Sequence, residues 1–297
     1  MNSQGLDESR SDAAGREALL VEAIAPANNR PSYLDFLQEC EHLTTADGRQ
    51  CDVFQLSVPV GHACLSDWAR RFRQTYCLDD ELDDLRAGTG KSRSQYLLDL
   101  VFPDKANAPG PGVRSGDFAE LLISDYIEFI LGYWVPRGKY AEKGSRDESV
   151  KGVDIVGFKL FDADRPTDQD ELLTFEVKAQ LSGRTYGDRL QIAVDDSAKD
   201  YLRIAQTLAA MKRRMLHARQ QVEALRVQRF QNIVDLPYTF KSGAAAVLIS
   251  GVFDAAKIQM TRSSGHNNAE ALSLLVVQGD DLMNLAHALY QRAADEA

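Results

Sequence analysis

The sequence predicts an α/β fold, in which helices flank a mixed central β-sheet and an N-terminal α+β subdomain precedes it. Two observations support this prediction. Amphipathic helical segments and strand-like segments follow one another in the order helix, three strands, helix, two strands and helix over the last two thirds of the chain. The chain also has 297 residues, of which 44% are hydrophobic, enough for one large domain or two modest ones.

Composition shifts along the chain predict its division into parts. Residues 1–27 are polar and lack periodicity, so we expect a disordered tail there. A proline- and glycine-rich run at residues 102–115 indicates a linker or long loop. We therefore expect an N-terminal α+β subdomain over residues 28–110, which could dock a partner, and a main domain over residues 111–297.

Hydrophobic periodicity predicts the individual elements. In chain order we expect a short helix at residues 31–43, a strand at 51–60, a helix at 62–78, a helix from Ser115 to Gly132, strands at 133–140, 152–161 and 172–181, a long helix at 195–228, strands at 244–253 and 272–277, and a helix at 280–293. The helix starting at Ser115 carries apolar residues at helical spacing. A polar, proline-containing turn separates the strands at 152–161 and 172–181, which favours an antiparallel hairpin.

The charge distribution is uneven. The net charge of −10 argues against tight binding of nucleic acid by the whole surface, because phosphate binding depends on Lys and Arg. Acidic residues gather at residues 78–85 and 162–171, whereas basic residues dominate residues 199–229. The sequence therefore predicts a local basic surface that could bind the DNA backbone, with a solvated face or a surface for an acidic partner as equal alternatives.

Several features indicate where in the cell the protein lies and whether its cysteines are reduced. No apolar stretch approaches the roughly 18 residues needed to cross a bilayer, and the first residues lack an apolar signal core, so we expect a cytoplasmic protein. The cysteines at positions 40, 51, 64 and 77 form no CxxC pair, so we expect reduced, mostly buried thiols rather than a zinc site or disulfide. No histidine lies at metal-ligand spacing from another.

Charged side chains in two strand-like segments carry the chemistry. Asp154 interrupts an otherwise apolar segment, and Glu176 and Lys178 alternate with apolar residues and so point to one face of their strand. If the two strands pair as a hairpin, Asp154 lies across from Glu176. Carboxylate oxygens are the ligands that Mg²⁺ prefers, so we expect a Mg²⁺ site here, which Mn²⁺ could also occupy. Lys178 could orient an attacking water.

These residues resemble the PD-(D/E)XK nucleases, whose signature is an acidic residue in the second core strand and Asp/Glu-X-Lys on the third. Here the match is Asp154 followed by Glu176-Val177-Lys178, with Val153 in place of the proline. Many members add a glutamate from the preceding helix, and Glu120 occupies that place. The resemblance implies a restriction-endonuclease-like core, with Glu120, Asp154 and Glu176 as metal ligands and Lys178 as the catalytic ammonium. A structural salt-bridge pair is the competing interpretation.

A narrower resemblance covers about residues 115–255. The segments GDFAELL, VKGVDIV, FEVKAQ and DDSAKDYL resemble HamA, the nuclease subunit of Hachiman antiphage defence systems. That resemblance implies a Mg²⁺-dependent deoxyribonuclease in a complex with a helicase subunit similar to HamB.

Five polar residues near the motif could contact nucleic acid. They are Lys139, Lys143, Gln191, Lys199 and Arg203. Solvated loop lysines, helix capping and an ordinary charged helix face are the competing explanations. Asp195 and Asp196 are expected to be carboxylates at a helix N-terminus rather than metal ligands.

Two other functions compete with DNA cleavage. A non-catalytic assembly or nucleic-acid-binding subunit could keep the fold, and loss of the motif would then leave complex formation intact. An RNA-cleaving effector could use the same fold, and comparing DNA and RNA in one cleavage assay separates it.

Overall fold

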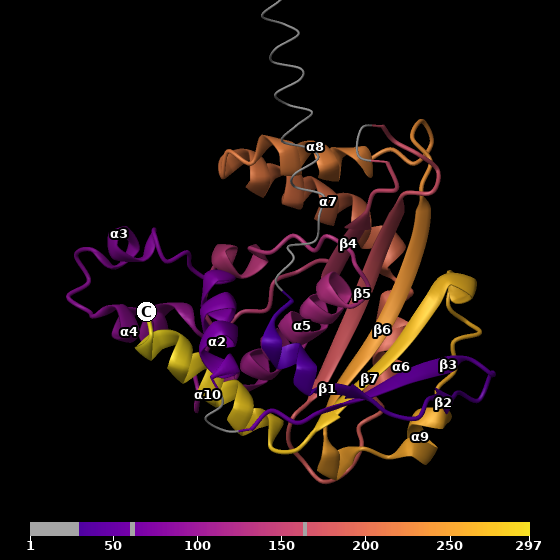
Figure 1. The fold of residues 1–297 in the computed structure, drawn as a ribbon, viewed down its shortest axis with the longest axis horizontal. Helices are drawn as coiled ribbons and strands as arrows, with labels where there is room; N and C mark the ends of the chain where they lie inside the picture. The colour runs from indigo at the N-terminus through magenta and orange to yellow at the C-terminus, as the bar shows by residue number, and fades with distance from the viewer. Residues whose placement is uncertain (1–29, 60–62, 163–164) are drawn as a thin grey trace, which may run out of the picture.

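A computed structural model of the chain describes residues 30–59, 63–162 and 165–297, and its centre is one mixed sheet of seven strands (Figure 1). The strands are β1 (Leu37–Glu39), β2 (Leu43–Thr44), β3 (Gln50–Leu56), β4 (Ile155–Lys159), β5 (Glu171–Gln180), β6 (Thr239–Ile249) and β7 (Leu272–Gly279). Their order is β1-β3-β7-β6-β5-β4, with β2 also paired to β3. The predicted mixed α/β fold is confirmed. The predicted tail at residues 1–27 lies outside the described residues.

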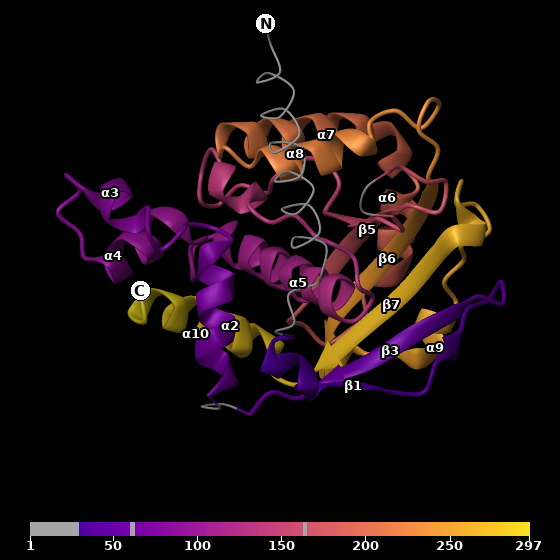
Figure 2. The ribbon, with the colours of Figure 1, turned by 45° about the horizontal axis from the view of Figure 1, so that its top comes forward.

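Helices cover both faces of this sheet (Figures 1 and 2). They are α2 (Cys64–Gln74), α3 (Leu82–Arg86), α4 (Arg93–Tyr96), α5 (Gly110–Phe129), α6 (Arg189–Ser197), α7 (Asp200–His217), α8 (Gln221–Arg229), α9 (Ala255–Gln259) and α10 (Leu282–Asp295). Short 3₁₀ turns lie at Ser32–Phe36, Lys139–Glu142, Ser250–Val252 and Ala269–Ala271, and a π-helical turn lies at Leu97–Val101. Within the described part of the chain, no helix is both long enough and apolar enough to span a bilayer.

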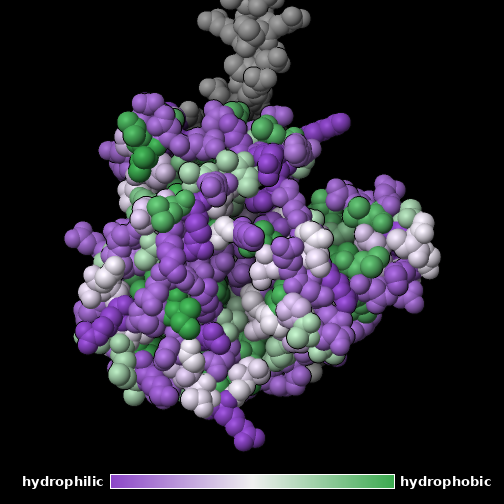
Figure 3. Space-filling model, turned by 180° about the vertical axis from the view of Figure 1, so that it is seen from behind, coloured by the Kyte–Doolittle hydropathy of each residue, from purple (hydrophilic) through white to green (hydrophobic). Residues whose placement is uncertain are grey.

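Side chains on the two faces of the sheet belong to different apolar layers. Phe175 and Val177 of β5 belong to a buried cluster with α2, α5 and α10, whereas Ala244 and Ala246 of β6 pack with α6 on the opposite face. A third cluster joins α7 and α8 to β4 and the start of β5. Because side chains alternate along a strand, Glu176 points to the face that α6 and α7 cover. On the rear side of the molecule, hydrophobic residues form only small separate groups (Figure 3).

The hairpin that carries the motif is confirmed. β4 pairs antiparallel with β5, with Ile155 opposite Phe175, and β5 then pairs in parallel with β6. The two motif segments are therefore held by the sheet itself, β4 at its edge and β5 one position inside.

Gly243 of β6 leaves room for the ring of Phe175. A Cβ at position 243 would lie 2.0 Å from Cε2 of that ring, so Gly243→Ala forces the ring or the strand to move. We expect the free energy of unfolding to fall by about 1–3 kcal/mol, measured by urea denaturation. Gly251→Ala is the matched control, because its Cβ meets nothing within 4 Å. Equal stability of the two variants would contradict this packing.

Several predicted elements differ in extent from the structure, including the following three. The short helix at 31–43 is only the 3₁₀ turn Ser32–Phe36, followed by β1 and β2. The helix predicted from Ser115 begins at Gly110, because a proline in the first turn is favourable where the backbone N–H needs no partner. The long helix at 195–228 is divided into α6, α7 and α8, and Arg219 separates the last two with a φ of 59°, which ends a helix.

The strand predicted at residues 133–140 is wrong. Only Trp134 makes a bridge, to Phe158, and the segment is otherwise irregular before a 3₁₀ turn. Pro136 lacks the N–H that a ladder needs, and Gly138 adopts a φ of 106°. This irregular segment places Lys139 and Tyr140 beside the motif.

Residues from both sides of position 110 share the sheet and one apolar cluster. β3 pairs in parallel with β7, and α2 packs against α10. The domain boundary near residue 110 stays a prediction. All four cysteines are free, and Cys51, Cys64 and Cys77 are buried, as predicted.

Candidate active site

The hairpin brings Asp154 to the side of Glu176. Asp154 comes one residue before β4, and the register that sets Ile155 opposite Phe175 places it across from Glu176. The backbone N–H of Val177 donates to Oδ2 of Asp154 at 3.0 Å. One carboxylate is thereby fixed to the backbone of the strand that carries the other.

Lys178 completes this group. Its Nζ lies 2.7 Å from Oε1 of Glu176 and 2.9 Å from Asp196 on α6. Glu176 is only 3% exposed, whereas the Lys178 side chain is partly open to solvent. Burial by itself would lower the pKa of Lys178, but the paired carboxylates outweigh it and raise that pKa, so the ammonium stays charged.

The site concentrates negative charge away from water. Burial raises the pKa of the Asp154 carboxyl well above its usual range, and the neighbouring Glu120 and Glu176 raise it further, against the opposing effect of Lys139. A cation bound here would relieve this repulsion and favour the ionised carboxylate.

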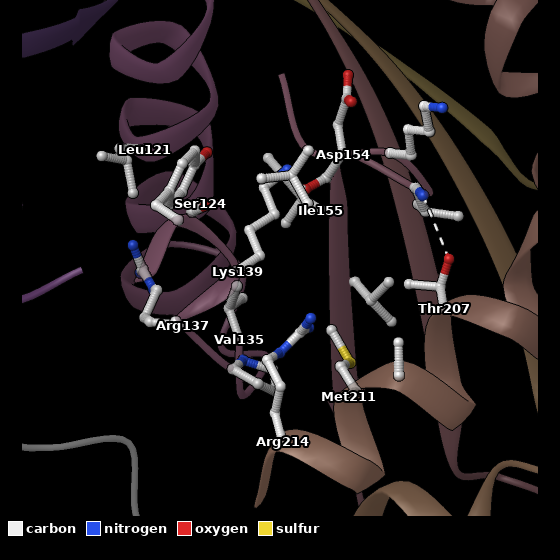
Figure 4. A pocket seen from close by; sticks show the side chains of 18 residues that line it. Leu121, Ser124, Val135, Arg137, Lys139, Asp154, Ile155, Thr207, Met211 and Arg214 are labelled. Atoms are coloured by element: carbon white, nitrogen blue, oxygen red, sulfur yellow. Dashed lines mark hydrogen bonds between the residues drawn. The ribbon is translucent and has the colours of Figure 1, made fainter. Parts of the chain in front are cut away.

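Glu120 reaches the site from α5 but is engaged there. Its Oε2 accepts a hydrogen bond from the Tyr140 hydroxyl at 2.7 Å and forms an ion pair with Lys139. Nζ of Lys139 also donates to the backbone carbonyl of Asp154 at 2.5 Å. In Figure 4, Lys139 extends toward the Asp154 backbone, while the Asp154 carboxylate points away from the lysine ammonium. Lys139 thus neutralises Glu120.

The carboxylates suit a hard divalent cation only in part. Among the described residues, no three His, Cys, Asp or Glu side chains converge in a metal-binding arrangement. Oε2 of Glu176, however, is buried and receives no hydrogen bond from the described part of the chain. This oxygen and the Asp154 carboxylate fit Mg²⁺, which takes one or two protein carboxylates and keeps several waters. Glu120 lies beside them, with its Oε2 engaged by Lys139 and Tyr140.

The predicted nucleic-acid contacts occupy different environments. Lys143 is buried in an ion pair with Asp117. Gln191 holds the backbone of Arg262 through both its amide atoms, at 2.8 and 3.1 Å. Lys199 is exposed and pairs with Asp196 at 2.6 Å, and Arg203 is turned inward onto Asp200. Of these four side chains, only that of Lys199 is mostly open to solvent.

The role predicted for Asp195 and Asp196 is wrong. α6 begins at Arg189, so these two residues lie in its last turn rather than at a helix N-terminus. Burial by itself would raise the pKa of Asp196, but charge-assisted hydrogen bonds from Lys199 and Lys178 outweigh it and lower that pKa.

The sequence did not single out Asp200, a buried acid beside Glu176. It has no exposed surface, and burial, followed by the charge of Glu176, raises its pKa to about 7. An acid on the inner face of an amphipathic helix, three residues before an arginine, was the signal that could have found it.

The predicted basic surface at residues 199–229 is smaller than the sequence implies. Arg226 and Arg229 are buried, and Arg229 forms a hydrogen-bonded ion pair with Asp170. Arg214 pairs with Glu142 at 3.3 Å. Arg213 and Lys199 remain on the exposed side of α7 and its N-terminus.

Comparison with known proteins gives one family. The family model described as HamA matches residues 31–293, nearly the whole chain. No curated protein matches the chain.

Proposed function

The chain belongs to the HamA family, and from this premise we propose that it is a metal-dependent deoxyribonuclease acting in antiphage defence. The cytoplasm and a helicase partner similar to HamB belong to the same proposal. Its main support is the hydrogen bond from Val177 N–H to Asp154 Oδ2, which puts that carboxylate beside the Glu176–Lys178 pair.

Each side chain has a role that its surroundings support. Asp154 and Glu176 would hold Mg²⁺, and Glu120 would add a third carboxylate. The ion would supply a coordinated water of lowered pKa and polarise the scissile phosphate. Lys178, whose raised pKa keeps it charged, would orient the attacking water and stabilise negative charge on the phosphate oxygens.

Cleavage assays separate this function from its competitors. Duplex DNA, single-stranded DNA and RNA are incubated with the full chain in Mg²⁺, in Mn²⁺ and in EDTA. We expect DNA to be cleaved only with a divalent ion. Cleavage of RNA alone would support the RNA-cleaving effector, and an inert chain that still assembles with its helicase partner and still protects cells would support the non-catalytic subunit.

The charge of the chain predicts dependence on a partner. With a net charge of −10 and most cations of the site already paired, the isolated chain should bind duplex DNA with a Kd weaker than about 1 μM at physiological salt. We expect fluorescence anisotropy to show this weak, salt-sensitive binding, and cleavage to increase when a helicase partner delivers the substrate. Tight binding that salt does not weaken would contradict this expectation.

A further inference from the structure

We propose that Arg203 is a positioning residue that, anchored by Asp200, orients Glu176 and leaves Oε2 of Glu176 free for a metal ion. This inference deepens the proposed function and rests on it. It assigns Arg203 to the architecture of the site, whereas the sequence suggests contact with a DNA phosphate.

The Arg203 guanidinium joins the segments that build the site. Nη2 lies 3.0 Å from Oδ1 of Asp200 on α7 and donates to the backbone carbonyl of Asp196 on α6 at 2.6 Å. Nη1 donates to the carbonyl of Gly152, two residues before Asp154, at 3.4 Å. A planar fork with several donors can hold such separate acceptors at once, which the single ammonium of a lysine cannot do in the same way.

The distance from Arg203 to Glu176 indicates that Arg203 stabilises the charge of Glu176 without a hydrogen bond to it. Nη2 lies 3.7 Å from Oε2 of Glu176, close enough to stabilise its charge but too long for a hydrogen bond. Lys178 meanwhile occupies Oε1 at 2.7 Å. Each oxygen of Glu176 thus faces a different cation, and only Oε2 keeps its lone pairs free.

Asp200 explains why the guanidinium stays at that distance. It is fully buried at the start of α7, and Nη2 of Arg203 lies 3.0 Å from its Oδ1 and 2.6 Å from the carbonyl oxygen of Asp196, both closer than Oε2 of Glu176 at 3.7 Å. Without this anchor, the guanidinium could advance onto Oε2 and occupy the position that a metal needs. Groups that orient metal ligands in this way commonly change metal affinity by about 10–100-fold when they are replaced.

The test measures Mn²⁺ binding to the full chain by electron paramagnetic resonance, without DNA. Arg203→Lys keeps the charge and removes the fork, so we expect its affinity for Mn²⁺ to fall at least about tenfold. Arg213→Lys is the matched control, since it makes the same exchange on an exposed position of α7, and it should bind Mn²⁺ as the unmodified chain does. Unchanged affinity in Arg203→Lys overturns the proposal.

A second variant distinguishes positioning from a purely electrostatic effect, because the two predict opposite changes in Mn²⁺ affinity. Arg203→Gln removes a cation 3.7 Å from a ligand oxygen, which by charge alone would tighten Mn²⁺ binding. Loss of positioning predicts weaker binding instead, so tighter binding overturns the proposal. Circular dichroism and thermal melting show which variants are folded, and either folded variant is sufficient for the decision.

Two further outcomes separate this inference from the proposed function. If Mn²⁺ binding to the unmodified chain is absent, or unaffected by Glu176→Gln, the metal site itself is wrong, and both ideas fail. If Glu176→Gln abolishes Mn²⁺ binding while Arg203→Lys only raises KM for DNA, Arg203 contacts phosphate, and only the positioning role fails.

Discussion

Exchange of Glu176 for glutamine should abolish divalent-ion-dependent DNA cleavage, with a loss of about 10³-fold or more. Glu176 is 3% exposed and supplies the buried oxygen Oε2, which receives no hydrogen bond from the described residues. A neutral amide removes the charge that a metal ion requires and weakens the pair with Lys178. A loss of several kcal/mol of transition-state stabilisation corresponds to this factor. Single-turnover cleavage of a labelled duplex, with partner present, measures it.

Glu171→Gln provides the matched control. Glu171 begins the same strand, but its carboxylate pairs with Lys241 at 2.6 Å and with the Tyr133 hydroxyl. We expect this variant to retain cleavage within a few-fold of the unmodified chain. If Glu176→Gln is equally active and folded, the cluster is a structural ion-pair network, and the non-catalytic interpretation is correct.

The hairpin could be predicted from the sequence because its signals are local. Asp154 interrupts an apolar strand, Glu176 and Lys178 alternate with core residues, and a polar turn lies between them. This alternation also sets the register, since a shift by one residue would turn Phe175 out of its apolar cluster with α2, α5 and α10 and onto the face that α6 and α7 cover. The juxtaposition of Asp154 and Glu176 therefore follows from the sequence pattern.

The partners of these side chains could not be predicted, because they come from distant segments. The position of Lys139 between Glu120 and the Asp154 carbonyl depends on an irregular segment for which the sequence predicts a strand. Arg203 also donates to the backbone carbonyl of Asp196 near the end of α6, a contact that the single continuous helix expected over residues 195–228 does not predict. Charge counts alone likewise cannot distinguish an exposed arginine from a buried one that has found a carboxylate.

Replacement of Arg229 by leucine should lower the free energy of unfolding by about 3–5 kcal/mol, because it leaves a buried carboxylate without its counter-charge. Asp170 is fully buried, and its Oδ2 accepts from Nε of Arg229 at 2.8 Å. The guanidinium also donates to the backbone carbonyls of Thr167, Leu236 and Pro237. Chemical denaturation measures the loss, and Arg213→Leu on the exposed side of α7 is the control, with an expected change within about 0.5 kcal/mol.

The source of this loss can be isolated by neutralising the remaining partner. Most of the cost should come from the uncompensated charge of Asp170, so the double variant Arg229→Leu, Asp170→Asn should recover part of the stability lost in Arg229→Leu. The Asp170 carboxylate also accepts a hydrogen bond from the backbone N–H of Phe161, and the Asp170 backbone carbonyl accepts one from the backbone N–H of Thr239. The pair therefore fixes the turn of the hairpin to β6, and Arg229→Leu should reduce cleavage as the turn loosens. A single variant that costs less than about 1 kcal/mol would show that the buried carboxylate of Asp170 does not depend on the arginine, and that the hairpin holds its register without this pair.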